Sequence, residues 1–195
     1  MTSPAEKRLV RRLRARAPDA FETLVRRYQS RVFNLVYRML GNREEAEDLA
    51  QEVFITIFKR IDDFRGESSL STWIYRIASN HCINRRKYLG RRRHYLRRSL
   101  SDVGDRIEMS GGRAGVTNRP PRPDEMLEGL QMERAIQRAI SSLDGDQRLL
   151  VVLRDIQGLT YEEIAEITEL PGGTIKSRLH RARMSLKEKL RKKTR

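Results

Sequence analysis

Residues 159–182 have the sequence LTYEEIAEITELPGGTIKSRLHRA, which predicts two helices joined by a tight turn. Thr160 and Glu163 have the spacing of a capping box, in which each side chain bonds the backbone N–H of the other residue. The turn is expected at residues 170–173 (LPGG), because proline and glycine interrupt helices. A second helix should open near Thr174. A short helix, a turn and a longer helix form the helix-turn-helix plan, whose second helix enters the major groove of DNA.

The second helix of this motif separates apolar from polar side chains. Its apolar positions recur on one side: Ile175, Leu179, Ala182, Leu186 and Leu190. The opposite side carries a polar set with one methionine: Lys176, Ser177, His180, Arg181 and Met184. Lys176 and Arg181 can donate to the acceptors of guanine, and Ser177 can donate or accept. Three further cations suit phosphate contacts instead: Arg178, Arg183 and Lys187.

The overall charge agrees with a nucleic-acid partner. The chain of 195 residues has 41 lysines and arginines against 26 acids, a formal net charge of +15. Such an excess favours a polyanion, because each neutralised phosphate releases condensed counterions. Residues 176–195 alone contain ten lysines and arginines and one acid. An anionic membrane surface, a solvated basic surface, and cations that only stabilise a helix C-terminus remain alternatives.

Several classes of protein are disfavoured by what the sequence lacks. Cys82 is the one cysteine, so no internal disulfide can form. The three histidines are scattered and suggest no metal site, and we expect no cofactor. No apolar leader or membrane-length run is present. The chain is therefore expected to be a cytoplasmic protein without membrane insertion.

Helical periodicity extends over most of the chain, and no alternating strand pattern is convincing. The first three expected helices cover about 18–40, 43–61 and 70–88, and they can close a small bundle. Residues 85–98 follow with eight basic residues and no acid. Periodicity resumes near Met126 and continues to the helix-turn-helix. The predicted fold class is therefore all-α.

Residues 99–125 are rich in glycine and proline and poor in large apolar side chains, as is typical of a flexible linker. An ordered long loop is the alternative. The expected organisation is a helical domain over 1–98, this linker, and a second helical domain over 126–195.

Two separate groups of motifs resemble those of bacterial sigma factors. Residues 21–88 resemble conserved region two through DLAQEVF at 48–54, FRGES at 64–68 and TWIYRIA at 72–78. Residues 143–190 resemble region four through LTYEEIA at 159–165 and GTIKSRL at 173–179. Because regions one and three have no counterpart, the chain most resembles the small extracytoplasmic-function group.

This resemblance implies a non-enzymatic subunit that binds core RNA polymerase and recognises promoters at two elements. The residues that match the family's polymerase-clamp face are Asp48, Gln51, Glu52 and Ile55. The residues that match positions near the melted −10 element are Phe64, Ser68, Ser69, Tyr75, Arg76 and Asn80. The residues that match the −35 reading helix are Thr174, Lys176, Ser177, Arg178, His180 and Arg181.

The resemblance also sets expectations for neighbouring residues and partners. The basic segment 85–98 should lie along promoter phosphates, and the linker should run toward the active-site channel of the polymerase. Trp73 belongs mainly to the core, whereas Tyr75 should offer an aromatic surface. His180 differs from the residues often found at its position. An anti-sigma factor is an expected partner, with the chain monomeric when free or bound one to one.

The main rival is a stand-alone helix-turn-helix regulator that binds duplex DNA as a dimer. It would leave the Asp48–Phe54 face and the Phe64–Ser69 loop without a role. A nucleic-acid enzyme is a third class, but no phosphate-binding glycine loop or nucleophile–base pattern supports it.

Overall fold

The structure is a computed structural model, and it describes residues 4–99 and 123–191. These residues form helices joined by short connections, and within these two ranges no strand is present. The all-α prediction is thereby confirmed. Most of the expected linker, 99–125, lies outside the described residues.

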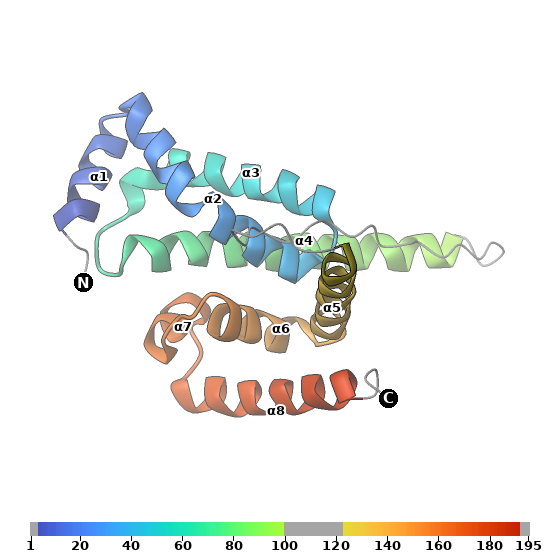
Figure 1. Ribbon diagram of the computed structural model, residues 1–195. Coiled ribbons are helices and arrows are strands. Elements are labelled where there is room, and N and C mark those ends of the chain that lie inside the picture. The colour runs from blue at the N-terminus through green and yellow to red at the C-terminus, as the bar shows by residue number, and fades with distance from the viewer. Residues whose placement is uncertain (1–3, 100–122, 192–195) are drawn as a thin grey trace.

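The N-terminal unit contains four α-helices and one short 3-10 helix (Figure 1). Their bounds are α1 Pro4–Arg14, α2 Pro18–Leu40, α3 Arg43–Arg60, η1 Ile61–Asp63 and α4 Leu70–Ser99. The three long helices α2, α3 and α4 pack on one another, as the sequence predicted for a bundle. Each contributes an apolar stripe to a common interior.

Helix α1 was not predicted from the sequence. Its apolar residues Val10 and Leu13 are buried, Leu9 is half-buried, and Arg11 and Arg12 face outward. Arg14 donates to the backbone carbonyl of Phe64, and Arg16 pairs with Asp62 at 2.7 Å. Helix α1 and the residues that follow it therefore brace the segment that leads from η1 into α4.

The boundary between α2 and α3 follows the local signals in the sequence. Gly41 ends α2 in the left-handed conformation at φ 80°, and its N–H donates to Tyr37 O. Glycine adopts this conformation without a Cβ penalty. Asn42 then caps α3, its side chain accepting from Glu45 N at 2.9 Å. The predicted stop and start are both confirmed.

Helix α4 is longer than the sequence suggested. The periodicity predicted a helix to about residue 88, followed by a separate basic segment. The structure continues one helix to Ser99, so residues 85–98 are helical. Its core-facing side includes Leu70, Ile74, Ala78 and Cys82.

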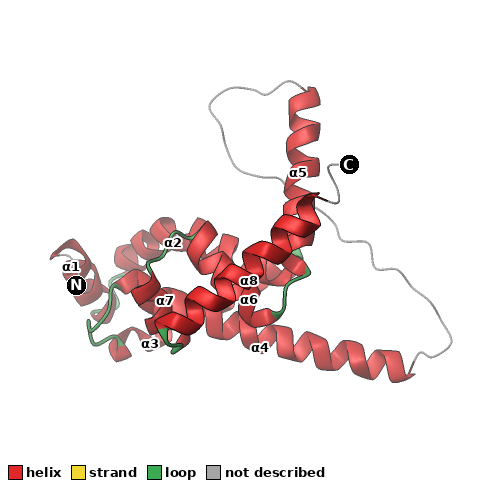
Figure 2. Cartoon of the chain, turned by 90° about the horizontal axis from the view of Figure 1, so that it is seen from below, coloured by secondary structure: helices red, strands yellow, loops and turns green. Residues whose placement is uncertain are grey.

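The C-terminal unit contains the remaining helices (Figure 2). Their bounds are α5 Pro123–Ser141, α6 Gly145–Val151, η2 Val152–Ile156, α7 Tyr161–Thr168 and α8 Gly172–Arg191. Helix α5 thus begins within the last residues assigned to the linker. The segment η2 continues α6 as a wider π-helical turn.

The helix-turn-helix formed by α7 and α8 is confirmed, with a different turn. Thr160 accepts from Glu163 N at 3.2 Å and the Glu163 carboxylate accepts from Thr160 N at 2.8 Å, which completes the predicted capping box. The left-handed residue that ends α7 is Glu169, at φ 58°. Gly172 and Gly173 instead lie in the first turn of α8.

The two units pack against each other in this structure. Their buried residues form one continuous hydrophobic cluster, with α5, α6 and η2 against α2 and α7 against α4. Arg148 of α6 lies in this interface and donates to Met39 O of α2 at 2.7 Å. Figure 1 shows α8 on the side of the C-terminal unit that faces away from the N-terminal unit.

The capping box gives a first prediction. Thr160→Ala should lower the free energy of unfolding by about 1 kcal/mol, because the N–H of Glu163 loses its acceptor. Urea denaturation of the full chain measures the effect. Thr160→Ser keeps the hydroxyl and should change stability by a few tenths of a kcal/mol at most. Equal losses in both variants would contradict the cap.

Candidate polymerase and DNA interfaces

An acidic face lies on the outer side of α3. Asp48, Gln51, Glu52 and Ile55 are all exposed, whereas Leu49 and Val53 between them are buried. Ile55 is 53% exposed, which places a large apolar side chain beside the acids. The structure therefore brings the four expected polymerase-facing residues together on one surface.

Arg85 of α4 reaches back to this acidic face. Its two terminal nitrogens pair with Glu52 Oε1 at 2.6 Å and with Glu45 Oε2 at 2.9 Å. Arg85 was expected to lie along promoter phosphates with the rest of 85–98, but in this structure its guanidinium binds two carboxylates of the same chain. This pairing could not be predicted from the sequence, because the two glutamates are 33 and 40 positions away from Arg85.

His81 joins the same network and was not singled out from the sequence. Its Nε2 lies 3.1 Å from Thr56 Oγ1, and its Nδ1 lies 3.9 Å from Glu52 Oε2. Burial lowers the pKa of His81, the Glu52 carboxylate opposes this effect, and Arg85 adds to the lowering. His81 is therefore held closer to neutrality than a solvated histidine.

The loop before α4 packs inward. Phe64 is 3% exposed, and its ring centroid lies 5.5 Å from that of the half-buried Trp73. Ser69 caps α4, its Oγ accepting from Thr72 N at 3.1 Å. Ser68 and Ser69 are half-buried. Trp73 thus packs partly in the core, in line with its assignment.

The part of α4 that was expected to contact the −10 element faces the C-terminal unit. Tyr75 is 1% exposed and donates to Gln157 Oε1 at 3.0 Å, so it does not present the aromatic surface that the sequence suggested. Burial raises the pKa of its hydroxyl. Arg76 donates to Glu166 O at 2.6 Å. Asn80 is exposed one turn further along.

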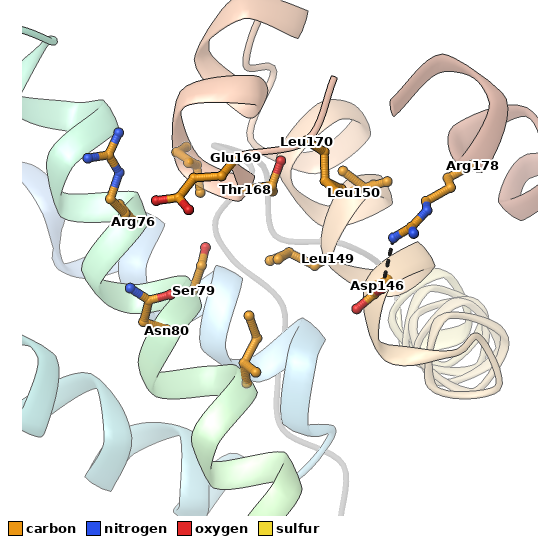
Figure 3. A pocket seen from close by; sticks show the side chains of 12 residues that line it. Arg76, Ser79, Asn80, Asp146, Leu149, Leu150, Thr168, Glu169, Leu170 and Arg178 are labelled. Atoms are coloured by element: carbon orange, nitrogen blue, oxygen red, sulfur yellow. Dashed lines mark hydrogen bonds and ion pairs between the residues drawn. The ribbon is translucent and has the colours of Figure 1, made fainter. Parts of the chain in front are cut away.

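A cavity of about 250 Å³ lies between α4 and the C-terminal unit (Figure 3). Arg76, Ser79 and Asn80 line it from α4, and Glu169 and Arg178 line it from the other side. Ser79 Oγ and Arg76 Nε are buried and have no hydrogen-bond partner among the described residues. Two of the side chains expected near the −10 element, Arg76 and Asn80, therefore border a cavity of mixed polar and apolar lining that contains unsatisfied polar atoms.

The outer face of α8 matches the expectation for a DNA-reading helix. Lys176, Ser177, His180 and Arg181 are exposed together, opposite the buried Ile175, Leu179 and Ala182. Thr174, at the start of this face, is half-buried. This arrangement presents hydrogen-bond donors from the early turns of the helix.

Two of the cations expected near phosphates are paired within the chain. Arg178 contacts Asp146 at 2.8 Å, the bond drawn dashed in Figure 3. Arg183 makes a two-point contact with Asp155, at 3.1 and 2.5 Å. Each would have to leave or share its carboxylate to reach DNA. Lys187 is exposed.

The described residues offer no metal site, no membrane span and no reactive thiol. Over residues 4–99 and 123–191, no three histidine, cysteine or acidic side chains gather as they would around a metal ion. None of the helices described is both long and apolar enough to span a membrane. Burial raises the pKa of the Cys82 thiol to about 12, which makes it a poor nucleophile.

Comparisons with known proteins match both units. The sigma-70 region 2 family matches residues 24–93, and the sigma-70 region 4 family matches residues 133–186. An ECF RNA polymerase sigma factor, SigW of Bacillus subtilis, is 34% identical over 95% of this chain and 96% of its own. The ECF RNA polymerase sigma-E factor of Escherichia coli is 37% identical over 93% and 92%.

Two solved structures share the fold. The sigma factor RpoE in complex with the anti-sigma factor NepR, from Bartonella quintana, has a TM-score of 0.62 at 23% identity, over 88% of this chain and 96% of that one. CnrH in complex with the cytosolic domain of CnrY has a TM-score of 0.62 at 22% identity, over 93% and 94%.

The environment of His81 predicts a pH dependence. Because its pKa is lowered on folding, the unfolded chain binds a proton more readily than the native chain does. The His81 contribution to stability is therefore complete above the unfolded pKa of about 6.5. It is lost as the pH falls from there through the lower pKa of His81 in the native chain. The free energy of unfolding of the wild type should drop over this interval relative to His81→Asn. Parallel pH profiles for the two proteins would contradict it.

Proposed function

The chain belongs to the sigma-70 family of RNA polymerase sigma factors, in its extracytoplasmic-function group, and we propose that its two helical units divide promoter recognition by their surface chemistry. It is an initiation factor rather than an enzyme. It binds core RNA polymerase and promoter DNA. This division of roles is supported by one observation: α3 has an exposed acidic face and α8 has an exposed basic face.

Helix α3 supplies the contact with polymerase. A protein of net charge +15 has little reason to present Asp48, Gln51 and Glu52 to DNA, because the carboxylates would repel phosphates. The same face suits a basic protein surface, with Ile55 as an apolar anchor. We assign it to the clamp of the largest polymerase subunit.

Helix α4 and the loop before it handle the melted −10 element, and α8 reads the −35 duplex. Arg76 and Asn80 carry donors for base edges, and the half-buried Ser68 and Ser69 lie beside them at the start of α4. Phe64 and Tyr75 are buried and support this surface from beneath. Extracting a base from the stack costs a few kcal/mol, which contacts of this kind must offset. On α8, Lys176 and Arg181 suit guanine and Ser177 and His180 add adaptable contacts.

We further propose the partners and the place of action. The chain acts in the cytoplasm, with a regulating anti-sigma factor, and is monomeric when free or paired one to one with that partner. One of the similar solved structures is a sigma factor in complex with an anti-sigma factor, which supports the proposal. A stand-alone regulator would leave the α3 face unused and is not favoured.

Charge reversal on α3 tests the polymerase contact. The double variant Asp48→Arg, Glu52→Arg should lose binding to core polymerase by more than about tenfold, because like charges replace attraction across the interface. Affinity is measured by surface-immobilised core polymerase, with promoter-dependent transcription as a second readout.

Glu22→Arg is the control for reversal of a surface acid, with half the change in net charge, because Glu22 is exposed on α2 and pairs with Arg26 of the same helix. It should leave polymerase affinity near the wild-type value. An equal loss of polymerase affinity in both proteins would mean that the effect comes from overall charge and not from the α3 face. Absence of promoter-dependent transcripts from the wild type, when transcript starts are mapped genome-wide, would overturn the function itself.

Substitution on α8 tests the −35 contact. Arg181→Ala should weaken binding to the preferred −35 duplex by about 1–3 kcal/mol and relax the base preference at one position. Lys187→Ala should weaken all duplexes alike, because a phosphate contact carries no sequence information. A randomised −35 duplex pool, bound by holoenzyme and sequenced, separates the two outcomes. An equal loss of affinity for all duplexes in Arg181→Ala would show that Arg181 does not contact a base.

A further inference from the structure

The loop before α4, which belongs to the proposed −10 surface, is fixed at both ends and exposed in the middle. At its first end Phe64 is buried, and at its second end Ser69 caps α4 by accepting from Thr72 N at 3.1 Å. Between these ends, residues 65–67 are exposed. Residues 64–69 are called the −10 loop below.

Helix α1 holds the first end of the −10 loop. Figure 1 shows α1 beside this loop where the chain passes from η1 to α4. Arg14, in the last turn of α1, donates to Phe64 O, and Phe64 N donates to Ile61 O at 3.2 Å. Both backbone groups of Phe64 are therefore bonded, and its ring packs against that of Trp73. Because hydrogen bonds from a charged donor are stronger than those between neutral groups, Arg14 fixes the point where the exposed part of the loop begins.

Arg16 holds the segment just before the −10 loop. Its guanidinium donates to Phe58 O, near the C-terminus of α3, and pairs with Asp62 of η1 at 2.7 Å. Its Cζ lies 4.9 Å from the centroid of the Phe58 ring. A cation at this end of a helix satisfies carbonyls that lack intrahelical donors. One side chain thus connects the end of α1 to the end of α3 and to η1.

The backbone of Arg16 has a conformation that suits glycine better than arginine. Arg16 lies in the left-handed region at φ 56°, which a Cβ disfavours. Its N–H donates to Leu13 O at 2.9 Å. Glycine would adopt the same backbone without the steric cost. The contacts of the guanidinium offset this strain, and strain that surrounding contacts maintain is typical of functional positions.

We propose that Arg14 and Arg16 are positioning residues for the −10 element, which hold the −10 loop in its DNA-binding shape before the strand binds. The physical gain is preorganisation, because a loop that is already ordered loses less conformational entropy on binding. Neither arginine has to touch DNA for this effect. The sigma-70 region 2 match begins at residue 24, so both arginines lie outside it. This inference rests on the proposed function, since it concerns the same −10 surface.

Two substitutions remove these contacts in different ways. Arg14→Met keeps a long side chain without its donors, and Arg16→Gly removes the guanidinium together with the backbone strain. Arg11→Met is the matched control, because Arg11 is exposed on the same helix and makes none of these contacts with the loop. All three variants lose one positive charge. Each full-length protein is assembled with core polymerase, and its affinity is measured for the single-stranded non-template −10 segment of a promoter found by the transcript mapping.

Arg14→Met and Arg16→Gly should each bind the −10 strand about tenfold more weakly than Arg11→Met, because the loop must then be ordered during binding. The affinities for −35 duplex and for core polymerase should stay at the wild-type value. The slope of log affinity against log salt should equal that of Arg11→Met, because no phosphate contact is lost. Amide hydrogen exchange over residues 65–68 should be faster in both variants than in the control.

Three outcomes would overturn the proposal. A salt slope smaller by about one than that of Arg11→Met would mean that the arginine contacts a phosphate directly. Equal losses for the −10 strand, the −35 duplex and core polymerase would mean that α1 supports only the fold. A −10 affinity equal to that of Arg11→Met would refute the positioning role and leave the proposed function intact. A wild-type holoenzyme that does not prefer the −10 strand to a scrambled strand would refute the −10 assignment of the proposed function instead.

Discussion

The arrangement of the whole molecule depends on a buried cation where two helices end. Arg148 is 6% exposed, and its guanidinium donates to carbonyls at the C-terminus of α2 (Met39 O) and just after α5 (Leu143 O). The last carbonyls of a helix lack intrahelical donors and carry partial negative charge, so a cation stabilises both helix ends. Burial and the nearby Arg86 lower the Arg148 pKa to about 10, which leaves the group charged at neutral pH. Because Met39 O belongs to the N-terminal unit whereas Ser141 O and Leu143 O, which also accept from Arg148, belong to its own unit, this charge is best satisfied when the units are together.

This constraint explains why the DNA-reading helix points outward. With α5 and α6 fixed against α2 by Arg148, α8 packs on the opposite side of α6 and keeps its polar face in solvent. The bonds of Arg178 to Asp146 and of Arg183 to Asp155 tie α8 to the α6–η2 segment. The helix-turn-helix is thus held by its own unit, and its exposure does not depend on how the two units are placed. The −10 surface of α4 differs, because its exposure changes with that placement.

Local signals made much of the fold predictable, and long-range pairing did not. The Gly41–Asn42 boundary and the Thr160–Glu163 capping box follow from residues within one turn of each other, and both were predicted. Helix α1 was missed because a few apolar residues among arginines form too narrow a stripe, and its burial depends on a partner surface. The exposure pattern of α8 was predicted from periodicity. The burial of Tyr75 and the pairing of Arg85 were not, since each depends on residues far along the chain.

The contact between α4 and the C-terminal unit combines apolar packing with hydrogen bonds. The buried residues of both units join one hydrophobic cluster, and Tyr75 and Arg76 are hydrogen-bonded across the interface to Gln157 and to Glu166 O. Two units of one chain meet at a high effective concentration, so even a weak contact between them is largely formed. A hydrogen bond contributes only about 0.5–1.5 kcal/mol net, whereas a buried polar atom without a partner costs about 1–3 kcal/mol. Ser79 Oγ and Arg76 Nε have no partner among the described residues, so they offset part of what these hydrogen bonds contribute, and apolar burial remains the main force that holds the units together.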